Sequence, residues 1–443
     1  NDRQVTTFGE TNQLQILDSI ILDCEKVKGQ ARNRFTRDAD SKGMITNAAI
    51  YAMLADMYLW RGSLHQGRGM LEDSVEVDTG YVVHTVKGDY QLAADYADLS
   101  LASLAKQNQD RFSSSYNPDI IDTENYGLEN CDMIENDFTG AYQSTAPQLE
   151  AQQYIFTNKN SIESIFELQY SSGEQENSAV NHLYGYTTGS HLEVSQDALA
   201  VCYGGWGNAK YDSRMWVGAQ NLVTTSSSSS STALSGYYCV KWQRPDVNWT
   251  GQQTSREIKN VQISSNKWCN WIIYRMTDVM LMKAEALACI GGAANNTLAK
   301  NIVNAIHRRS YCNYNESKPV SPDLTSGSTN GNATNNSDIV VMVLNERQIE
   351  LLGEGKRWFD LVRYAERNSD SASEAADERE ATEEKHVGNG QKGMIKMVDT
   401  FLRNAYSNYY TTLKNRFKNR YGLYSPIYYM DVKASDGKLH QNP

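Results

Sequence analysis

The densest group of side chains that could do chemistry lies near the end of the sequence, in LNERQIELLGEGKRWFDLVRY, residues 344–364. Its glutamates and aspartate could transfer protons, and its arginines could bind an anionic or polar ligand. Acids and arginines stand three residues apart at four steps: Arg347–Glu350, Glu354–Arg357, Arg357–Asp360 and Asp360–Arg363. Residues at this spacing are neighbours on a helix, so we expect a ladder of ion pairs.

Paired carboxylates stay ionised, which makes them poor proton donors. Catalytic carboxylates usually face a cleft, where their pKa values are driven apart. We therefore predict no catalytic residue here and assign a structural role to Glu350, Arg357, Trp358, Asp360 and Arg363. Trp358 is expected to be a buried aromatic, and Gly353 and Gly355 are expected to allow a bend.

A second group of candidate residues consists of aromatic side chains in the middle of the chain. The sequence has 27 Tyr and 8 Trp against 9 Phe. Tyr and Trp combine an apolar face, on which a sugar ring can stack, with a polar edge. The ligand-binding candidates are Tyr184, Tyr186, Tyr203, Trp206, Trp242 and Trp249.

Composition limits the other function classes. The formal net charge is -11 over 443 residues, which argues against binding nucleic acid or anionic lipid. The seven cysteines show no CxxC pair or zinc spacing, so mostly free, buried thiols are expected. DADSKG, residues 38–43, resembles the start of a calcium loop but has Ala49 at the closing position. We expect no cofactor and no metal.

The elements that must position these residues are mainly helical. Helical spacing of apolar residues predicts helices over 11–28, 46–62, 63–78, 274–292 and 296–310. Thr46 or Asn47 can cap the second of these, and Gly62 is expected to end it. When residues 53–62 are aligned with 282–291 in the sequence, small residues and a glycine fall at matching positions, which is typical of tetratricopeptide-like hairpins.

The middle of the chain has a different character. ESIFELQY, residues 163–170, alternates as a strand does, and the loops around it are rich in Gly, Ser and aromatics. The sequence predicts three parts: a helical part over 1–107, a loop-rich region with short strands over 108–268, and a second helical part over 269–443. We expect them to form one compact, mainly α unit.

Several motifs in this chain resemble those of the SusD/RagB family of outer-membrane nutrient-binding lipoproteins found in Bacteroidetes. They occur in the family's order: NAAIYAMLADMYLWRG, ESIFELQY, YDSRM, YRMTDVMLMKAEALA, NERQIELLGEGKRWFDLVRY and the ending YGLYSPIYYMDV with LHQNP. Tyr428 stands where the family usually has a proline, and Ile349 replaces the usual Leu. The lipidated cysteine is not in this sequence, which opens on a polar stretch.

The resemblance implies a tetratricopeptide scaffold with a loop-rich region, and a protein that is not an enzyme. It also implies a lipid-anchored position on the extracellular face of the outer membrane. Its partners would be a SusC-like TonB-dependent transporter and an oligosaccharide or peptide ligand, and not nucleic acid.

Two alternatives remain open from the residues alone. A glycan-active enzyme would need two carboxylates facing a cleft, for example Asp212 and Glu193. A helical adaptor that binds only protein would leave the aromatic loops unexplained.

Overall fold

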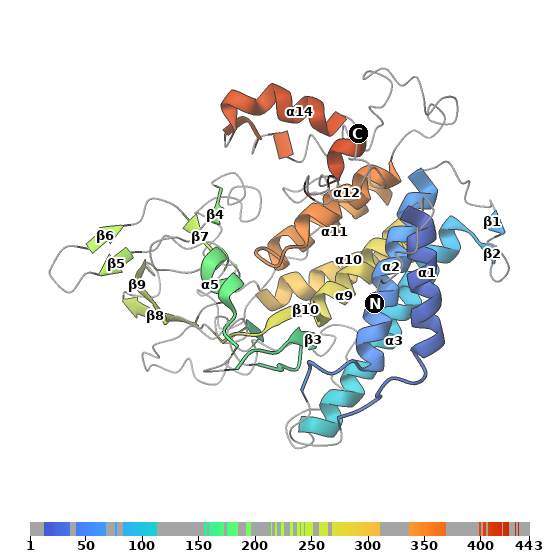
Figure 1. Cartoon of the computed structure of the whole chain (residues 1–443), viewed down its shortest axis with the longest axis horizontal. Helices are drawn as coiled ribbons and strands as arrows, with labels where there is room; N and C mark the ends of the chain where they lie inside the picture. The colour runs from blue at the N-terminus through green and yellow to red at the C-terminus, as the bar shows by residue number, and fades with distance from the viewer. Residues whose placement is uncertain are drawn as a thin grey trace.

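Most helices lie on one side of the molecule, with β1 and β2 beside them; β4–β9 lie on the other side, and β3 and β10 lie between (Figure 1). The helices are α1 (Gln13–Val27), α2 (Asn47–Gly67), α3 (Val86–Phe112), α5 (Ser178–Tyr184), α9 (Met276–Ile290), α10 (Ala293–Ser310), α11 (Asn336–Glu350), α12 (Arg357–Arg367), α14 (Tyr410–Lys418) and the 3-10 turns η4 (Ser407–Tyr409) and η5 (Arg420–Leu423). The strands are β1 (Glu76–Val77), β2 (Val83–His84), β3 (Ser164–Leu168), β4 (Glu193–Val194), β5 (Val223–Thr225), β6 (Ser231–Ala233), β7 (Tyr237–Tyr238), β8 (Arg244–Thr250), β9 (Glu257–Ser264) and β10 (Trp271–Arg275).

This computed structural model describes part of the chain. The described residues are 13–35, 41–67, 76–77, 83–112, 155–156, 159–171, 175–184, 192–195, 214, 218, 223–225, 231–233, 237–239, 241–242, 244–250, 257–264, 268–310, 336–368, 398–399, 402–404, 406–418, 420–424, 430 and 433.

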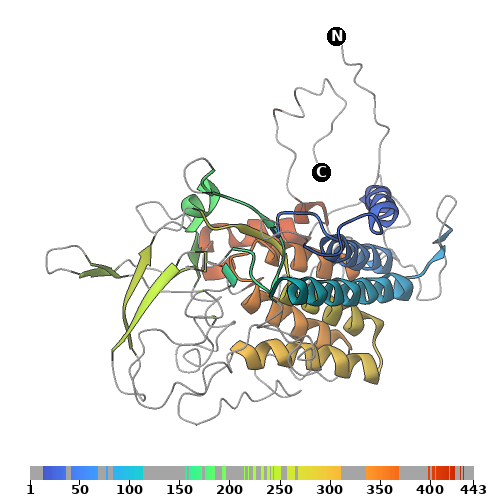
Figure 2. The same cartoon turned by 90° about the horizontal axis from the view of Figure 1, so that it is seen from below.

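The helices pack as hairpins. α2 packs along α3, α9 along α10, and α11 connects to α12 through residues 351–356. The hairpins join because α3 and α11 both pack on α9, while α12 packs on α2. Figure 2 shows the helices running alongside one another in successive layers. One large apolar cluster, with Leu54, Tyr90 and Val279 among its members, fills the space between them.

Local patterns predicted many of these elements correctly. α1, α9 and α10 confirm the helices expected over 11–28, 274–292 and 296–310, and β3 confirms the strand within 163–170. The predicted cap is also present, since the Ala49 amide donates a hydrogen bond to Thr46 Oγ1 at 3.4 Å.

The predicted end of the second helix at Gly62 is wrong. α2 continues to Gly67, so 63–67 belong to the same helix, and the hairpin partner is α3 rather than a helix over 63–78. A Cβ at Gly62 would lie 2.9 Å from a ring carbon of Tyr90 on α3. Gly62 therefore permits close packing of two helices instead of ending one of them.

The loop-rich region has its own small core. β3 pairs antiparallel with β10, and the other described sheets are antiparallel pairs as well: β1–β2, β4–β7, β5–β6 and β8–β9. A second apolar cluster includes Phe156, Tyr184, Cys239, Trp242 and Ile272. The boundaries at residues 107 and 268 stay a prediction.

The cysteines that the structure describes are free, as the sequence predicts. Cys24, Cys239 and Cys269 are free and buried, and Cys289 is free and half-buried; Cys131, Cys202 and Cys312 lie outside the described residues. Within the described helices, none combines the length and apolar character needed to cross a membrane.

Candidate functional site

Glu350 and Glu354 stand at the centre of a buried ion network. Arg275 donates to Glu350 at 2.7 Å and to Glu354 at 2.7 Å, and Arg309 reaches Glu350 at 2.6 Å. Arg214, from the loop-rich region, reaches Glu350 at 3.1 Å. All five side chains are buried.

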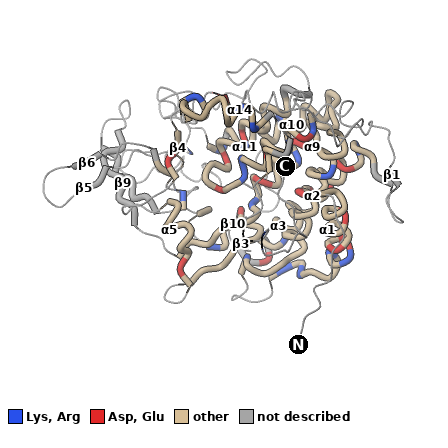
Figure 3. The backbone as a smooth tube through the Cα atoms, turned by 45° about the horizontal axis from the view of Figure 1, so that its top comes forward, with Lys and Arg blue, Asp and Glu red and all other residues tan. Residues whose placement is uncertain are grey.

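A second part of the network ties α12 to α9 and α11. Arg363 contacts Glu285 at 2.6 Å and Asp360 at 2.8 Å. Arg347 bridges Asp360 at 2.9 Å and Asp278 at 3.0 Å. In Figure 3 acidic and basic residues are interspersed through the helical part, as such pairing requires.

Glu350 and Glu285 are held in their charged form. Burial alone would raise the pKa of Glu350, but Arg309 and Arg275 hold it well below its usual range. Burial would also raise the pKa of Glu285, but Arg363 and Arg367 lower it to about 2. Such groups cannot donate a proton near neutral pH, so the network is suited to holding elements together.

The predicted ladder of ion pairs is only partly right. Asp360 and Arg363 do pair at the helical spacing of three residues. Glu350 and Glu354 pair instead with Arg275 on β10, and Arg357 donates to the Leu344 carbonyl at 2.9 Å. The reason is that 344–364 is two helices joined by a turn, so the ladder is interrupted.

The expected burial of Trp358 is wrong. Its side chain is 38% exposed, and its ring lies 5.7 Å from that of Phe417. The predicted bend is correct: Gly353 and Gly355 have φ values of 80° and 76°, a conformation that favours glycine. Residues 351–356, called the 351–356 turn below, reverse the chain between α11 and α12.

The loop-rich region contacts the helical part of the chain at this turn. The Gly353 carbonyl accepts a hydrogen bond from Tyr184 Oη at 2.5 Å and another from Trp242 Nε1 at 3.1 Å. Lys241 Nζ donates to the Glu350 carbonyl and to Glu354 Oε1, both at 2.8 Å. We call Tyr184, Lys241 and Trp242 the anchor residues.

Two of the six predicted ligand-binding aromatics are therefore described in full. Trp242 is 0% exposed and stacks on Trp271 at 4.5 Å, and Tyr184 is buried too. Neither ring has a face open to solvent, and a ligand role for either stays a prediction that requires the ring to be uncovered. Tyr186, Tyr203 and Trp206 lie outside the described residues, as does the side chain of Trp249 on β8.

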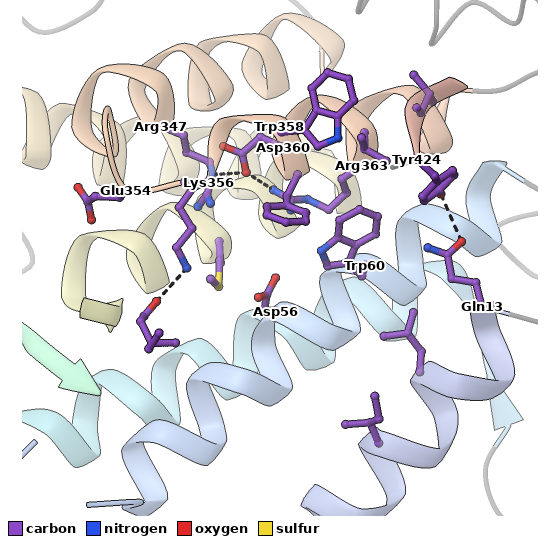
Figure 4. Close-up of a pocket in the computed structure, with 18 of the residues that line it drawn as sticks. Gln13, Asp56, Trp60, Arg347, Glu354, Lys356, Trp358, Asp360, Arg363 and Tyr424 are labelled. Atoms are coloured by element: carbon purple, nitrogen blue, oxygen red, sulfur yellow. Dashed lines mark hydrogen bonds and ion pairs between the residues drawn. The ribbon is translucent and has the colours of Figure 1, made fainter. Parts of the chain in front are cut away.

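An apolar groove opens on the other side of the turn, with a cavity volume of about 850 Å³. We call it the α1–α12 groove; it is lined chiefly by Ile16, Ile20, Asp56, Trp60, Trp358 and Phe359. Figure 4 shows Asp56 and Trp60 on α2 facing Lys356, Asp360 and Arg363 across it. The size suits a ligand or a packed segment of polypeptide.

Most charged groups along this groove already have partners. Lys356 binds Asp278 at 3.0 Å, and the network holds Arg347, Asp360 and Arg363. Asp56 differs, because its contact in the described part of the chain is the Tyr274 hydroxyl at 3.0 Å. Burial raises the pKa of Asp56, and the nearby Lys356 only partly offsets that rise.

Sequence reasoning missed the α1–α12 groove. Ile16 and Ile20 recur at helical spacing, which predicts burial, yet they are 50% and 37% exposed. The signal in the sequence was that α1 has apolar residues on more than one face. Among the residues that the structure describes, no cluster of His, Cys, Asp and Glu could hold a metal ion.

Comparison with known proteins defines the class. Residues 103–443 match the model of the SusD family, so this chain belongs to the SusD family. SusD-like protein P38 of Formosa agariphila is 36% identical over 94 residues, which is 21% of this chain and 17% of that protein.

A solved structure supports the fold. A SusD homolog from Bacteroides thetaiotaomicron VPI-5482 is similar with a TM-score of 0.53 and 16% identity, over 99% of this chain and 71% of that one. A SusD superfamily protein from Bacteroides vulgatus ATCC 8482 has a TM-score of 0.44 and 19% identity, over 79% of this chain and 55% of that one. This chain thus spans about half the length of the latter. The resemblance and the mainly helical, tetratricopeptide-like fold expected from the sequence are confirmed.

Proposed function

We propose that this protein captures an oligosaccharide at the cell surface and delivers it to a SusC-like TonB-dependent transporter in the outer membrane. The match of residues 103–443 to the SusD family carries the proposal, since that family comprises surface-associated nutrient-binding proteins. An N-terminal lipid anchor would hold it on the extracellular face.

The buried network favours binding over catalysis. The acids of the 344–364 stretch that could have done chemistry are bound by arginines, with the pKa values of Glu350 and Glu354 lowered. Ligand contact is proposed for the loop-rich aromatics, first Trp206 and Tyr203, because a sugar ring can stack on their faces. Each such contact is worth roughly 1 kcal/mol, so several must act together.

Affinity electrophoresis against a panel of purified polysaccharides tests this role. The wild type should be retained by at least one of them, and Trp206→Ala should lose retention without loss of folding. Trp358→Ala is the matched control, because it removes a partly exposed tryptophan of the frame. Retention that survives Trp206→Ala but disappears in Trp358→Ala would contradict the proposed site.

Two further measurements separate the alternatives. A peptide library probed in parallel distinguishes a peptide ligand from a glycan. The release of new reducing ends from a retained polysaccharide would point to a glycan-active enzyme and against the proposal.

The transporter partner is tested separately. Co-purification of a large β-barrel from the native membrane is the expected result.

A further inference from the structure

We propose that the anchor residues Tyr184, Lys241 and Trp242 are positioning residues for ligand binding. They join the described part of the loop-rich region to the 351–356 turn, and ligand affinity depends on this contact. The inference rests on the proposed function, in which the loop-rich region takes the ligand.

The first observation is that separate segments converge on one short stretch of backbone. Tyr184 ends α5, whereas Lys241 and Trp242 follow β7. Tyr184 and Trp242 share a single acceptor, the Gly353 carbonyl, and Lys241 binds the Glu350 carbonyl and the Glu354 carboxylate. All three anchor residues are buried, so water competes little for these hydrogen bonds.

The second observation is that the contact is close and depends on glycine. Gly353 has a φ of 80°, and a Cβ there would lie 2.6 Å from Cys239 Sγ and 3.7 Å from a ring carbon of Tyr184. The turn therefore packs closely against Cys239, with no room for a side chain at position 353. Such packing fixes the position of one segment relative to the other.

The third observation is that β10 holds the 351–356 turn in place. Glu354 accepts two hydrogen bonds from Arg275, both at 2.7 Å, and Trp271 on the same strand lies under Trp242 with an angle of 11° between the rings. The anchor residues thus bind a fixed point. A ligand site is more effective when its side chains are held before the ligand arrives.

Two of the proposed ligand aromatics follow the anchor residues closely along the chain. Tyr186 comes two residues after Tyr184, and Trp249 comes seven residues after Trp242, on β8. Loosening an anchor residue should therefore weaken the contribution that the segment following it makes to ligand binding. Ligand affinity should fall even in protein that remains folded.

A pair of tyrosine variants tests the inference. Tyr184→Phe removes only the hydroxyl that binds Gly353. Tyr90→Phe is the matched control, because Tyr90 is also buried and donates to Gln66 Oε1 at 2.8 Å within the helical part of the chain. The probe is an oligosaccharide of the polysaccharide that the wild type retains best, or the best peptide from the library, and its affinity is measured by calorimetry well below the unfolding midpoint.

We expect Tyr184→Phe to weaken the affinity by about 3- to 30-fold, and Tyr90→Phe to leave it within about twofold, although both variants should unfold at a lower temperature. Trp242→Phe, which keeps an apolar ring but loses the indole N–H, should act as Tyr184→Phe does. It provides the same test if Tyr184→Phe fails to fold.

Equal affinities for the wild type, Tyr184→Phe and Trp242→Phe would overturn the inference and leave the proposed function standing. Equal losses in Tyr184→Phe and Tyr90→Phe would also overturn it, because they would show a general effect of destabilisation. A wild type that binds no glycan and no peptide would overturn the proposed function itself, and this inference with it.

Discussion

The acidic side chains on the two sides of the 351–356 turn have opposite surroundings. On the network side, three arginines contact Glu350, while Arg275 and Lys241 contact Glu354. The pKa values of both glutamates are lowered in spite of burial. On the groove side, Asp56 is met by a tyrosine hydroxyl, and burial raises its pKa. On the network side the acids have cationic partners. On the groove side apolar side chains remain exposed.

This difference changes how the charge-rich stretch should be interpreted. Dense charge marks a structural network when arginines from other elements reach every acid, as Arg275 and Arg309 do here. Removing one partner then leaves an uncompensated buried charge, which is costly. Open surfaces are indicated instead by exposed apolar side chains such as Ile16 and Phe359.

The largest effect is expected from breaking the network at its centre. Glu350→Gln should lower the free energy of unfolding by about 3–5 kcal/mol, because it leaves three buried arginines without that charge. Chemical denaturation measures the change. Asp23→Asn, in the exposed pair with Lys26, is the control and should stay within about 0.5 kcal/mol. A loss below 1 kcal/mol for Glu350→Gln would contradict a structural role.

Two tryptophan variants test the anchor residues against the α1–α12 groove. Trp242→Ala should cost about 3–5 kcal/mol, because the ring is fully buried and stacked on Trp271. Trp358→Ala should cost only about 1–2 kcal/mol, because its ring is partly exposed. Thermal and chemical unfolding of both variants checks the order. The reverse order would mean that the groove is covered in solution.

Two glycines in the turn sharpen the same comparison. Gly353→Ala should cost about 2–4 kcal/mol, since it adds a clash with Cys239 to the strain of a positive φ. Gly355→Ala carries the same strain but meets no atom within 4 Å, so about 1–2 kcal/mol is expected. Equal losses would show that the contact at Gly353 is loose, which would also weaken the case for the anchor residues.

The smallest effect, with the opposite sign, is expected at Asp56. Its pKa is raised in the folded protein, so above the ordinary value of 3.8 ionisation favours the unfolded chain. Asp56→Asn should therefore stabilise the protein at neutral pH, by under about 1 kcal/mol. The gain should vanish below about pH 4, where both states are protonated. A loss of stability at pH 7 would show that Asp56 has a cationic partner.

Local features of the fold could be predicted from the sequence. Helical periodicity located α1, α9 and α10, and alternation located β3, because these patterns depend on neighbours in the chain. The end of α2 could not be predicted, since the glycine that suggested it is explained by Tyr90 on another helix.

Tertiary features of the site were beyond local patterns. Arg275 lies 75 residues before Glu350, so no helical spacing could have paired them. Ile16 and Trp358 belong to residue types that are usually buried, and only packing decides which of their faces is covered. The aromatic loops were predicted from composition alone, and most of their side chains lie outside the described residues.

The most direct test of the account is a structure of the protein with its bound ligand. We predict that the ligand contacts the loop-rich aromatics, with Trp206 and Tyr203 foremost, and that Glu350, Glu354 and Asp360 keep their arginine partners. A ligand held by those three carboxylates, or seated in the α1–α12 groove, would contradict it.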